Sequence, residues 1–169
     1  MQDYTLEYGN KDEGFLAYTD ADWGSETTTR RSTSGFLVKL GGAAVSWTSK
    51  AQKTVVLLST EAEYMSLSDT SRQLVWTCSL MQETGFKLSP LPLCRDNQGA
   101  IFIASNAVQE KRTKHIDICY HYIREVVKQG QVELFFIPTE ENPADMFTKI
   151  FAWDKFQSYR SQLGIRFGS

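Results

Sequence analysis

Acidic residues stand where several elements of the chain are expected to begin or end, and carboxylates in that arrangement can bind metal ions. Asp20 and Asp96 each close an apolar segment, and Asp145 stands at the start of the last helical stretch. An acidic pair, Glu61 and Glu63, lies where a long helix begins. Carboxylate oxygens suit Mg²⁺ or Mn²⁺, and two such ions about 4 Å apart can promote hydrolysis of a phosphodiester. The pattern therefore predicts a two-metal hydrolytic site.

A simpler interpretation of these residues stays open on the pattern alone. The chain has 20 acidic residues, and those at helix starts usually act as caps, whereas those at strand ends usually belong to turns.

Asp22 should share a face with Asp20, because residues two apart in a strand point the same way, but it is expected to lie past the site. Crowded carboxylates repel one another, so a catalytic arrangement would require a divalent cation.

Hydrophobic periodicity predicts the elements that must position these carboxylates. Strands are predicted over 14–20, 35–40, 43–48, 91–96 and 131–137. Helices are predicted over 60–83, 98–104, 116–128 and 143–163. The Gly41-Gly42 turn makes the second and third strands antiparallel, whereas the later strand–helix units must cross over in parallel. The order predicts an α/β fold with a mixed five-stranded sheet, three antiparallel strands then two parallel ones, flanked by helices.

Chain length and local signals define the domain organisation. A chain of 169 residues fits one domain, which we expect to cover residues 14–165, preceded by a polar lead-in over residues 1–13. Ser59 is a suitable N-cap for the long helix, whose apolar stripe includes Tyr64 and Leu67.

Composition excludes several classes of protein. A hydrophobic share of 41% and a charged share of 22% indicate a globular domain, and the net charge of −2 argues against coating nucleic acid by bulk charge. The three cysteines are widely spaced, which favours a reducing, intracellular compartment over a disulfide framework. Apolar runs such as Val55–Leu58 are far shorter than the roughly 20 residues of a membrane-spanning helix, so no membrane partner is expected.

A set of short motifs, in this order along the chain, is more specific than any one of them. They are Tyr18–Trp23, Arg31–Gly35, Ser46–Lys50, Leu58–Tyr64, Arg95–Asn97, Arg112–Asp117 and Asn142–Lys149. Together they resemble the ribonuclease H domain of copia-type (Pseudoviridae) LTR retrotransposon polyproteins, from about Phe15 to Ile150. The resemblance implies a ribonuclease H-like fold and Mg²⁺-dependent endonucleolytic cleavage of the RNA strand of RNA–DNA hybrids during reverse transcription.

Carried over residue by residue, the resemblance implies a catalytic set that would bind two Mg²⁺ or Mn²⁺ ions. Asp20, Asp96 and Asp145 match the three aspartates of the family, but the motif around Glu61 and Glu63 offers two candidates for the glutamate. At about 100° per residue, Glu63 lies about 40° from Leu67, within the stripe that faces the sheet, whereas Glu61 lies about 120° away. Helical geometry therefore favours Glu63 as the fourth catalytic and metal-binding residue.

Basic residues identify the expected nucleic-acid contacts. Lys111, Arg112, Lys114 and Arg124 belong to the densest basic stretch, and Arg30 and Arg31 follow the first strand. Such residues can bind backbone phosphates without reading sequence, and hybrid duplexes are recognised largely by shape and 2′-hydroxyl groups. A solvated helix face is the alternative interpretation of the basic stretch.

The partners implied by the resemblance are an RNA–DNA hybrid and the adjacent reverse transcriptase domain of the same polyprotein. An active element would place the domain in a cytoplasmic virus-like particle. Two other functions remain open. One is a non-catalytic structural or tethering domain that supports a polymerase, and the other is a different two-metal nuclease of the same fold.

Overall fold

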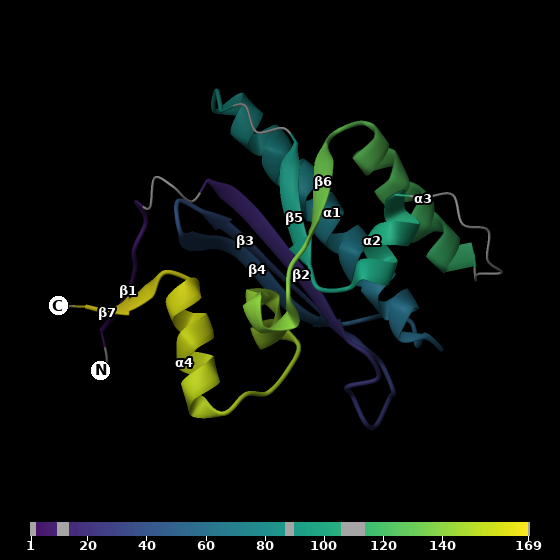
Figure 1. The fold of residues 1–169 in the computed structure, drawn as a ribbon, viewed down its shortest axis with the longest axis horizontal. Helices are drawn as coiled ribbons and strands as arrows, with labels where there is room; N and C mark the ends of the chain where they lie inside the picture. The colour runs from purple at the N-terminus through teal and green to yellow at the C-terminus, as the bar shows by residue number, and fades with distance from the viewer. Residues whose placement is uncertain (1–2, 10–13, 87–89, 106–113, 169) are drawn as a thin grey trace.

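A five-stranded mixed sheet forms the centre of the computed structural model, which describes residues 3–9, 14–86, 90–105 and 114–168 (Figure 1). Its strand order is β4-β3-β2-β5-β6. The strands are β2 (Phe15–Asp22), β3 (Thr33–Leu40), β4 (Ala43–Ala51), β5 (Leu91–Arg95) and β6 (Val132–Phe136). β3 pairs antiparallel with β2 and β4, and β5 pairs parallel with β2 and β6. The predicted fold class is therefore confirmed.

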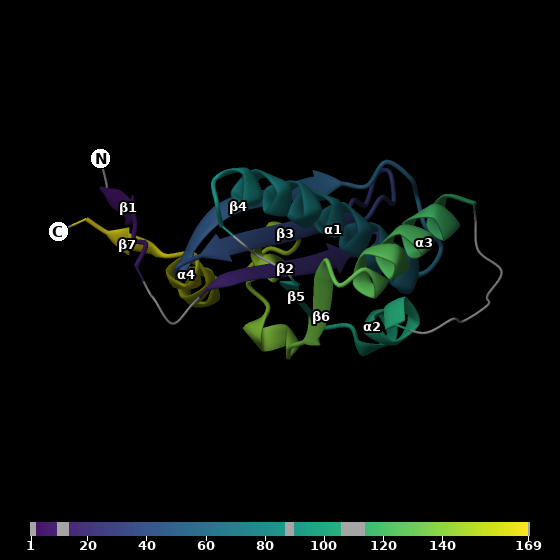
Figure 2. The same ribbon diagram turned by 90° about the horizontal axis from the view of Figure 1, so that it is seen from above.

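Helices cover both faces of this sheet (Figure 2). They are α1 (Ser59–Glu83), α2 (Gln98–Ser105), α3 (Lys114–Lys128) and α4 (Trp153–Gln162), with 3₁₀ helices η1 (Thr139–Glu141) and η2 (Pro143–Phe147). Alternation along β3 divides the core between the faces. Phe36 and Val38 pack in the main apolar cluster with Leu67 of α1, whereas Leu37 packs on the opposite face with Phe147 and Leu163.

Three features of the elements around the acidic residues differ from the prediction. The expected helix over 143–163 is broken into η2 and α4, because η2 turns inward to pack on β2 and β3. The N-cap of α1 is Leu58 and not Ser59, which is the first helical residue. β2 continues through Asp22, so that Asp20 lies within the strand and pairs with Gly35 of β3.

The polar lead-in contains a strand that the sequence did not reveal. β1 (Tyr4–Leu6) pairs antiparallel with β7 (Ile165–Phe167) near the two ends of the chain (Figures 1 and 2). Each strand has three residues, which is too short for its periodicity to be recognised.

Among the described residues, no helix is both long enough and apolar enough to cross a membrane.

Candidate metal centre

Three aspartates from separate elements converge at the carboxyl ends of β2 and β5. Each of Asp20, Asp96 and Asp145 offers one carboxylate oxygen, and these atoms all lie within 4.8 Å of one another. The parallel register brings Asp20 and Asp96 together, since it pairs Tyr18 with Cys94 two residues earlier. Asp145 is contributed by η2. We call these three residues the acidic cluster.

Close packing of η2 against the sheet brings Asp145 to the other two aspartates. The amide of Asn142, fully buried, donates a hydrogen bond to the Thr19 carbonyl at 3.1 Å and accepts one from the Ala144 backbone N–H at 3.1 Å. Gly35 provides the space for this approach. A Cβ atom at that position would lie 2.8 Å from Cγ2 of Thr148. A side chain on Gly35 would therefore push η2 away from the acidic cluster.

Two residues that follow Asp145 also contact the acidic cluster. The Thr148 hydroxyl donates a hydrogen bond to the Asp20 carboxylate. The Lys149 ammonium lies 3.0 Å from Oδ1 of Asp145 and 3.4 Å from Oδ2 of Asp20. Sequence reasoning assigned no role to either residue. Their spacing of three and four residues from Asp145 was the available signal, because it places side chains on one face of a helical segment.

Glu63 lies beside the acidic cluster but is bound by an arginine. Its Oε2 accepts a hydrogen bond from Nη2 of Arg95 at 2.5 Å, and the Arg95 side chain is fully buried. The pKa of Glu63 is raised to about 7, mainly by burial, which Arg95 opposes and to which the charges of Asp20 and Asp96 add. The structure thus places Glu63 within electrostatic reach of the aspartates, with its carboxylate neutralised by a neighbouring cation.

Glu61 has a different environment at the first turn of α1. Its carboxylate accepts hydrogen bonds from the backbone N–H groups of Leu57 at 3.1 Å and Leu58 at 3.4 Å. These bonds satisfy donors that a helix start leaves unpaired. Glu61 therefore has the capping role that is usual for acidic residues at helix starts, whereas Glu63 lies next to the aspartates.

The buried carboxylates of the acidic cluster repel one another electrostatically. The pKa of Asp145 is raised to about 6, mainly by burial and also by the neighbouring charge of Asp20, while Lys149 opposes the shift. Burial also raises the pKa of Asp22, but this residue is not part of the cluster. For Lys149, burial would lower the pKa, but the charges of Asp20 and Asp145 outweigh it and raise the value. Close, buried carboxylate oxygens of this kind fit a divalent cation, which would relieve their repulsion.

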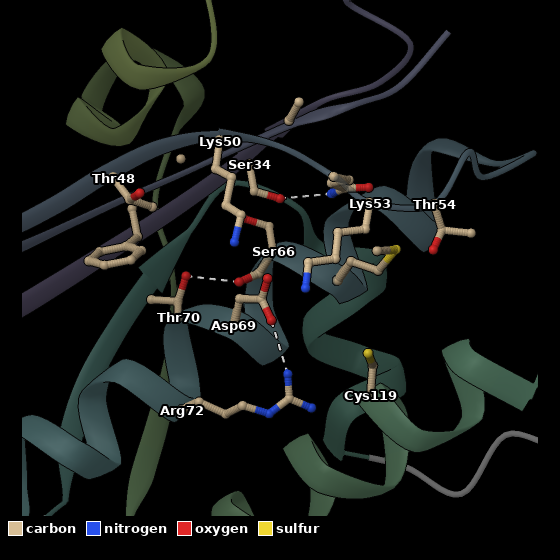
Figure 3. A pocket seen from close by; sticks show the side chains of 15 residues that line it. Ser34, Thr48, Lys50, Lys53, Thr54, Ser66, Asp69, Thr70, Arg72 and Cys119 are labelled. Carbon is tan, nitrogen blue, oxygen red and sulfur yellow. Dashed lines mark hydrogen bonds and ion pairs between the residues drawn. The ribbon is translucent and has the colours of Figure 1, made fainter. Parts of the chain in front are cut away.

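A pocket of about 340 Å³ lies between β3, β4 and α1 (Figure 3). Gln52, at its wall, donates hydrogen bonds to Oγ of Ser34 and to the Ala62 carbonyl, both at 2.8 Å. These bonds tie the end of β4 to β3 and to the first turn of α1, directly before Glu63. Lys50 and Lys53 also line the pocket, and sequence reasoning did not single them out.

The expected nucleic-acid contacts are described only in part. Arg30 and Arg31 lie exposed in the loop after β2, where Arg30 adopts the left-handed region with φ of 57°. Arg124 of α3 lies over the Tyr120 ring, with 5.3 Å between Cζ and the ring centroid. Lys111, Arg112 and the side chain of Lys114 are outside the described residues.

Comparison with solved structures identifies the class of fold. A ribonuclease H1 isolated from compost by a metagenomic approach has a TM-score of 0.61 and 14% identity over 80% of this chain and 92% of that chain. Ribonuclease H1 from the archaeon Halobacterium salinarum has a TM-score of 0.57 and 16% identity over 80% of this chain and 95% of its own. The protein is thus a ribonuclease H-like domain by fold.

Sequence comparison identifies homologues of the chain. It is 39% identical over 160 residues to the retrovirus-related Pol polyprotein from transposon TNT 1-94 of Nicotiana tabacum, covering 95% of this chain and 12% of that polyprotein. It is 43% identical over 151 residues to that from transposon RE2 of Arabidopsis thaliana, covering 88% of this chain and 10% of the polyprotein. The chain is homologous to a segment of these retrotransposon Pol polyproteins and spans about a tenth of their length. No protein-family model matches it.

Proposed function

We propose that this domain is a ribonuclease H that cleaves the RNA strand of RNA–DNA hybrids during reverse transcription. The observation that carries the proposal is the convergence of Asp20, Asp96 and Asp145, with Glu63 beside them. They meet at the carboxyl ends of the inner strands β2 and β5 of a ribonuclease H-like sheet. Homology to retrotransposon Pol polyproteins supports the same conclusion, because reverse transcription creates hybrids whose RNA must be removed.

The proposed cofactors are two Mg²⁺ or Mn²⁺ ions held by these four carboxylates. Such ions lower the pKa of a bound water and stabilise the leaving oxygen of a phosphodiester. The protein keeps its ligands in place without them. The Thr148 hydroxyl orients Asp20, and packing of η2 around Asn142 fixes the position of Asp145. Glu63 would be the fourth ligand, and contact with a metal ion would require it to give up its hydrogen bond from Arg95.

The proposed substrate contacts are electrostatic. Arg30 and Arg31 lie exposed in the loop that follows the carboxyl end of β2, the strand that carries Asp20. Arg124 of α3 is a further proposed phosphate contact, together with Lys111, Arg112 and Lys114 of the same basic stretch of sequence. Contacts of this kind bind backbone phosphates, while duplex shape and 2′-hydroxyl groups favour a hybrid. A compost ribonuclease H1 of the same fold was solved in complex with an RNA/DNA hybrid, with a TM-score of 0.56.

A second candidate function is a non-catalytic domain that supports a polymerase. The observation in its favour is internal charge compensation, because Arg95 binds Glu63 and Lys149 binds two aspartates. A purely structural domain would keep these pairs permanently. Both functions imply an adjacent reverse transcriptase domain as partner and a reducing, intracellular compartment. The free thiols of Cys78, Cys94 and Cys119 are compatible with such a compartment.

One experiment separates the two functions. The domain is incubated with end-labelled RNA annealed to DNA, with double-stranded RNA and with double-stranded DNA, each in Mg²⁺, in Mn²⁺ and in EDTA. A nuclease of the proposed kind cuts the RNA of the hybrid alone, and only with a divalent ion. A structural domain binds without cutting under every condition. The Asp20→Asn variant, purified in parallel, controls for contaminating nucleases.

A further inference from the structure

A protein cation, the Lys149 ammonium, contacts the acidic cluster. The Lys149 ammonium lies between Asp145, at 3.0 Å, and Asp20, at 3.4 Å, and so contacts two of the three carboxylates that would bind a divalent ion. A metal ion that uses the same oxygens as ligands needs the space next to them. Two cations in that space would repel each other strongly in a partly buried environment. A divalent ion bound through Oδ2 of Asp20 and Oδ1 of Asp145 would therefore compete with Lys149 for these oxygens.

The two internal cations of the site differ in how freely they can move. The Arg95 side chain is fully buried, and its Nε and Nη1 atoms have no hydrogen-bond partner in the described part of the chain. Moving it would require the surrounding core to open. The Lys149 side chain is 33% exposed and is attached just after η2, at the surface. Its flexible stem can carry the ammonium into water while the backbone stays in place.

We propose that Lys149 is an exchangeable counter-ion that holds Asp20 and Asp145 in the metal-free domain and is displaced when a divalent ion binds. The inference rests on the proposed function, because it concerns the same metal site. It assigns Lys149 a positioning role. Without metal, the ammonium offsets the repulsion between two buried carboxylates. With metal, the ammonium must leave its contacts, and this requirement weakens divalent binding.

Metal affinity measured without nucleic acid tests the proposal. Mn²⁺ and Mg²⁺ are titrated calorimetrically into the wild-type domain and into Lys149→Met, which keeps an unbranched stem but lacks the charge. Removal of a competing unit charge next to the ligands should lower the Kd at least about tenfold. The matched control is Lys155→Met, which changes the net charge equally. The Lys155 ammonium lies 4.8 Å from the Phe151 ring centroid, and its loss should change the Kd less than twofold.

A conservative variant provides an opposite expectation. Lys149→Arg keeps the charge and can pair with both carboxylates through its planar fork, so its Kd should equal or exceed that of the wild type. Lys149→Met should also have a lower melting temperature than wild type in EDTA and recover it at saturating Mg²⁺. Unchanged or weaker metal binding in Lys149→Met, in protein with normal circular dichroism, would overturn the proposal, as would tighter binding in Lys149→Arg.

Failure of the proposal differs from failure of the proposed function. If wild type binds Mn²⁺ and Asp20→Asn does not, the metal site exists, and an unchanged Kd in Lys149→Met rejects only the counter-ion role. If wild type binds no more Mn²⁺ than Asp20→Asn, the acidic cluster is not a metal site and both ideas are rejected.

Discussion

The two ends of β2 contribute opposite properties to the molecule. Its first half packs Phe15 and Ala17 into the main apolar cluster, beside Leu67 and Leu74 of α1. Its last residues lead to the acidic cluster, where Asp20 is buried among other carboxylates. Burial of apolar surface stabilises the fold, whereas burial of close like charges opposes it.

This contrast separates the source of stability from the source of activity. The apolar end requires no counter-ion, because its side chains carry no charge and pack against other apolar side chains. The acidic end needs cations, and the protein provides Lys149 and Arg95 where a divalent ion is absent. Substitutions at the two ends should therefore have opposite profiles. Those in the apolar cluster should reduce stability and spare the chemistry, whereas those in the acidic cluster should abolish the chemistry and spare or improve stability.

Asp20→Asn should have the largest effect and the sharpest profile of the acidic end. We expect hybrid cleavage to fall more than about a thousandfold, because a metal ligand and its charge are lost. Hybrid binding should persist or tighten, since less negative charge faces the phosphates. Single-turnover cleavage and an electrophoretic binding assay measure both quantities. Turnover near the wild-type rate would show that Asp20 is not a metal ligand.

Leu74→Ala tests the apolar end of the comparison. Leu74 is fully buried in the main cluster, and truncation should reduce the free energy of unfolding by about 2–5 kcal/mol. Cleavage per folded molecule should stay near wild type at a temperature where the variant is folded. Urea denaturation and cleavage of the same preparation give the two values. A specific loss of activity in folded protein would mean that the two ends are not independent.

The two glutamates of α1, Glu61 and Glu63, provide a matched pair of substitutions close to the acidic end of β2. Glu63→Gln should lower activity at least about a hundredfold, because a carboxylate that contacts metal contributes several kcal/mol in the transition state. Glu61→Gln removes a charge two residues away. It should raise the activation free energy of cleavage by less than about 1 kcal/mol, because it changes only the electrostatics of the helix start. Steady-state cleavage compares them, and circular dichroism verifies that α1 persists. The reverse ranking would assign the catalytic role to Glu61.

Asp145→Asn should give a smaller, pH-dependent gain in stability without metal. The pKa of Asp145 rises on folding from 3.8 to about 6, so the folded protein binds the proton more tightly than the unfolded chain does. The stability linked to that proton is present below pH 4 and is lost as the pH rises to about 6. In EDTA, the variant should therefore melt at the same temperature as wild type near pH 4 but at a higher one above pH 7. A variant that melts lower than wild type above pH 7 would contradict the proposed repulsion.

The fold and the convergence of Asp20, Asp96 and Asp145 could be predicted from the sequence because both depend on signals at the ends of elements, whereas their roles in metal binding stay a prediction. Periodicity located the five strands of the sheet, and the parallel pairing of β2 with β5 brings Asp20, near the end of β2, close to Asp96, directly after β5. The break between η2 and α4 could not be predicted in this way, since it depends on how Asn142 and Gly35 let η2 approach the sheet.

The cations of the site were also missed, for a related reason. Arg95 and Lys149 look like ordinary charged residues in the sequence, and only tertiary packing shows that one is buried beside Glu63 and the other lies between two aspartates. Helical spacing from Asp145 could have indicated Lys149. Nothing local distinguishes Arg95, because a charged residue at a strand end is usually exposed.

The chemistry of the product ends tests the central claim most directly, namely that the acidic cluster uses metal-activated water to cleave RNA in a hybrid. RNA cut by the wild-type domain in Mg²⁺ should carry 5′-phosphate and 3′-hydroxyl ends, because water attacks phosphorus and the 3′ oxygen departs. EDTA and Asp20→Asn should each abolish these products. RNA that ends in a 2′,3′-cyclic phosphate or a 3′-phosphate, or cleavage that survives chelation, would contradict the account.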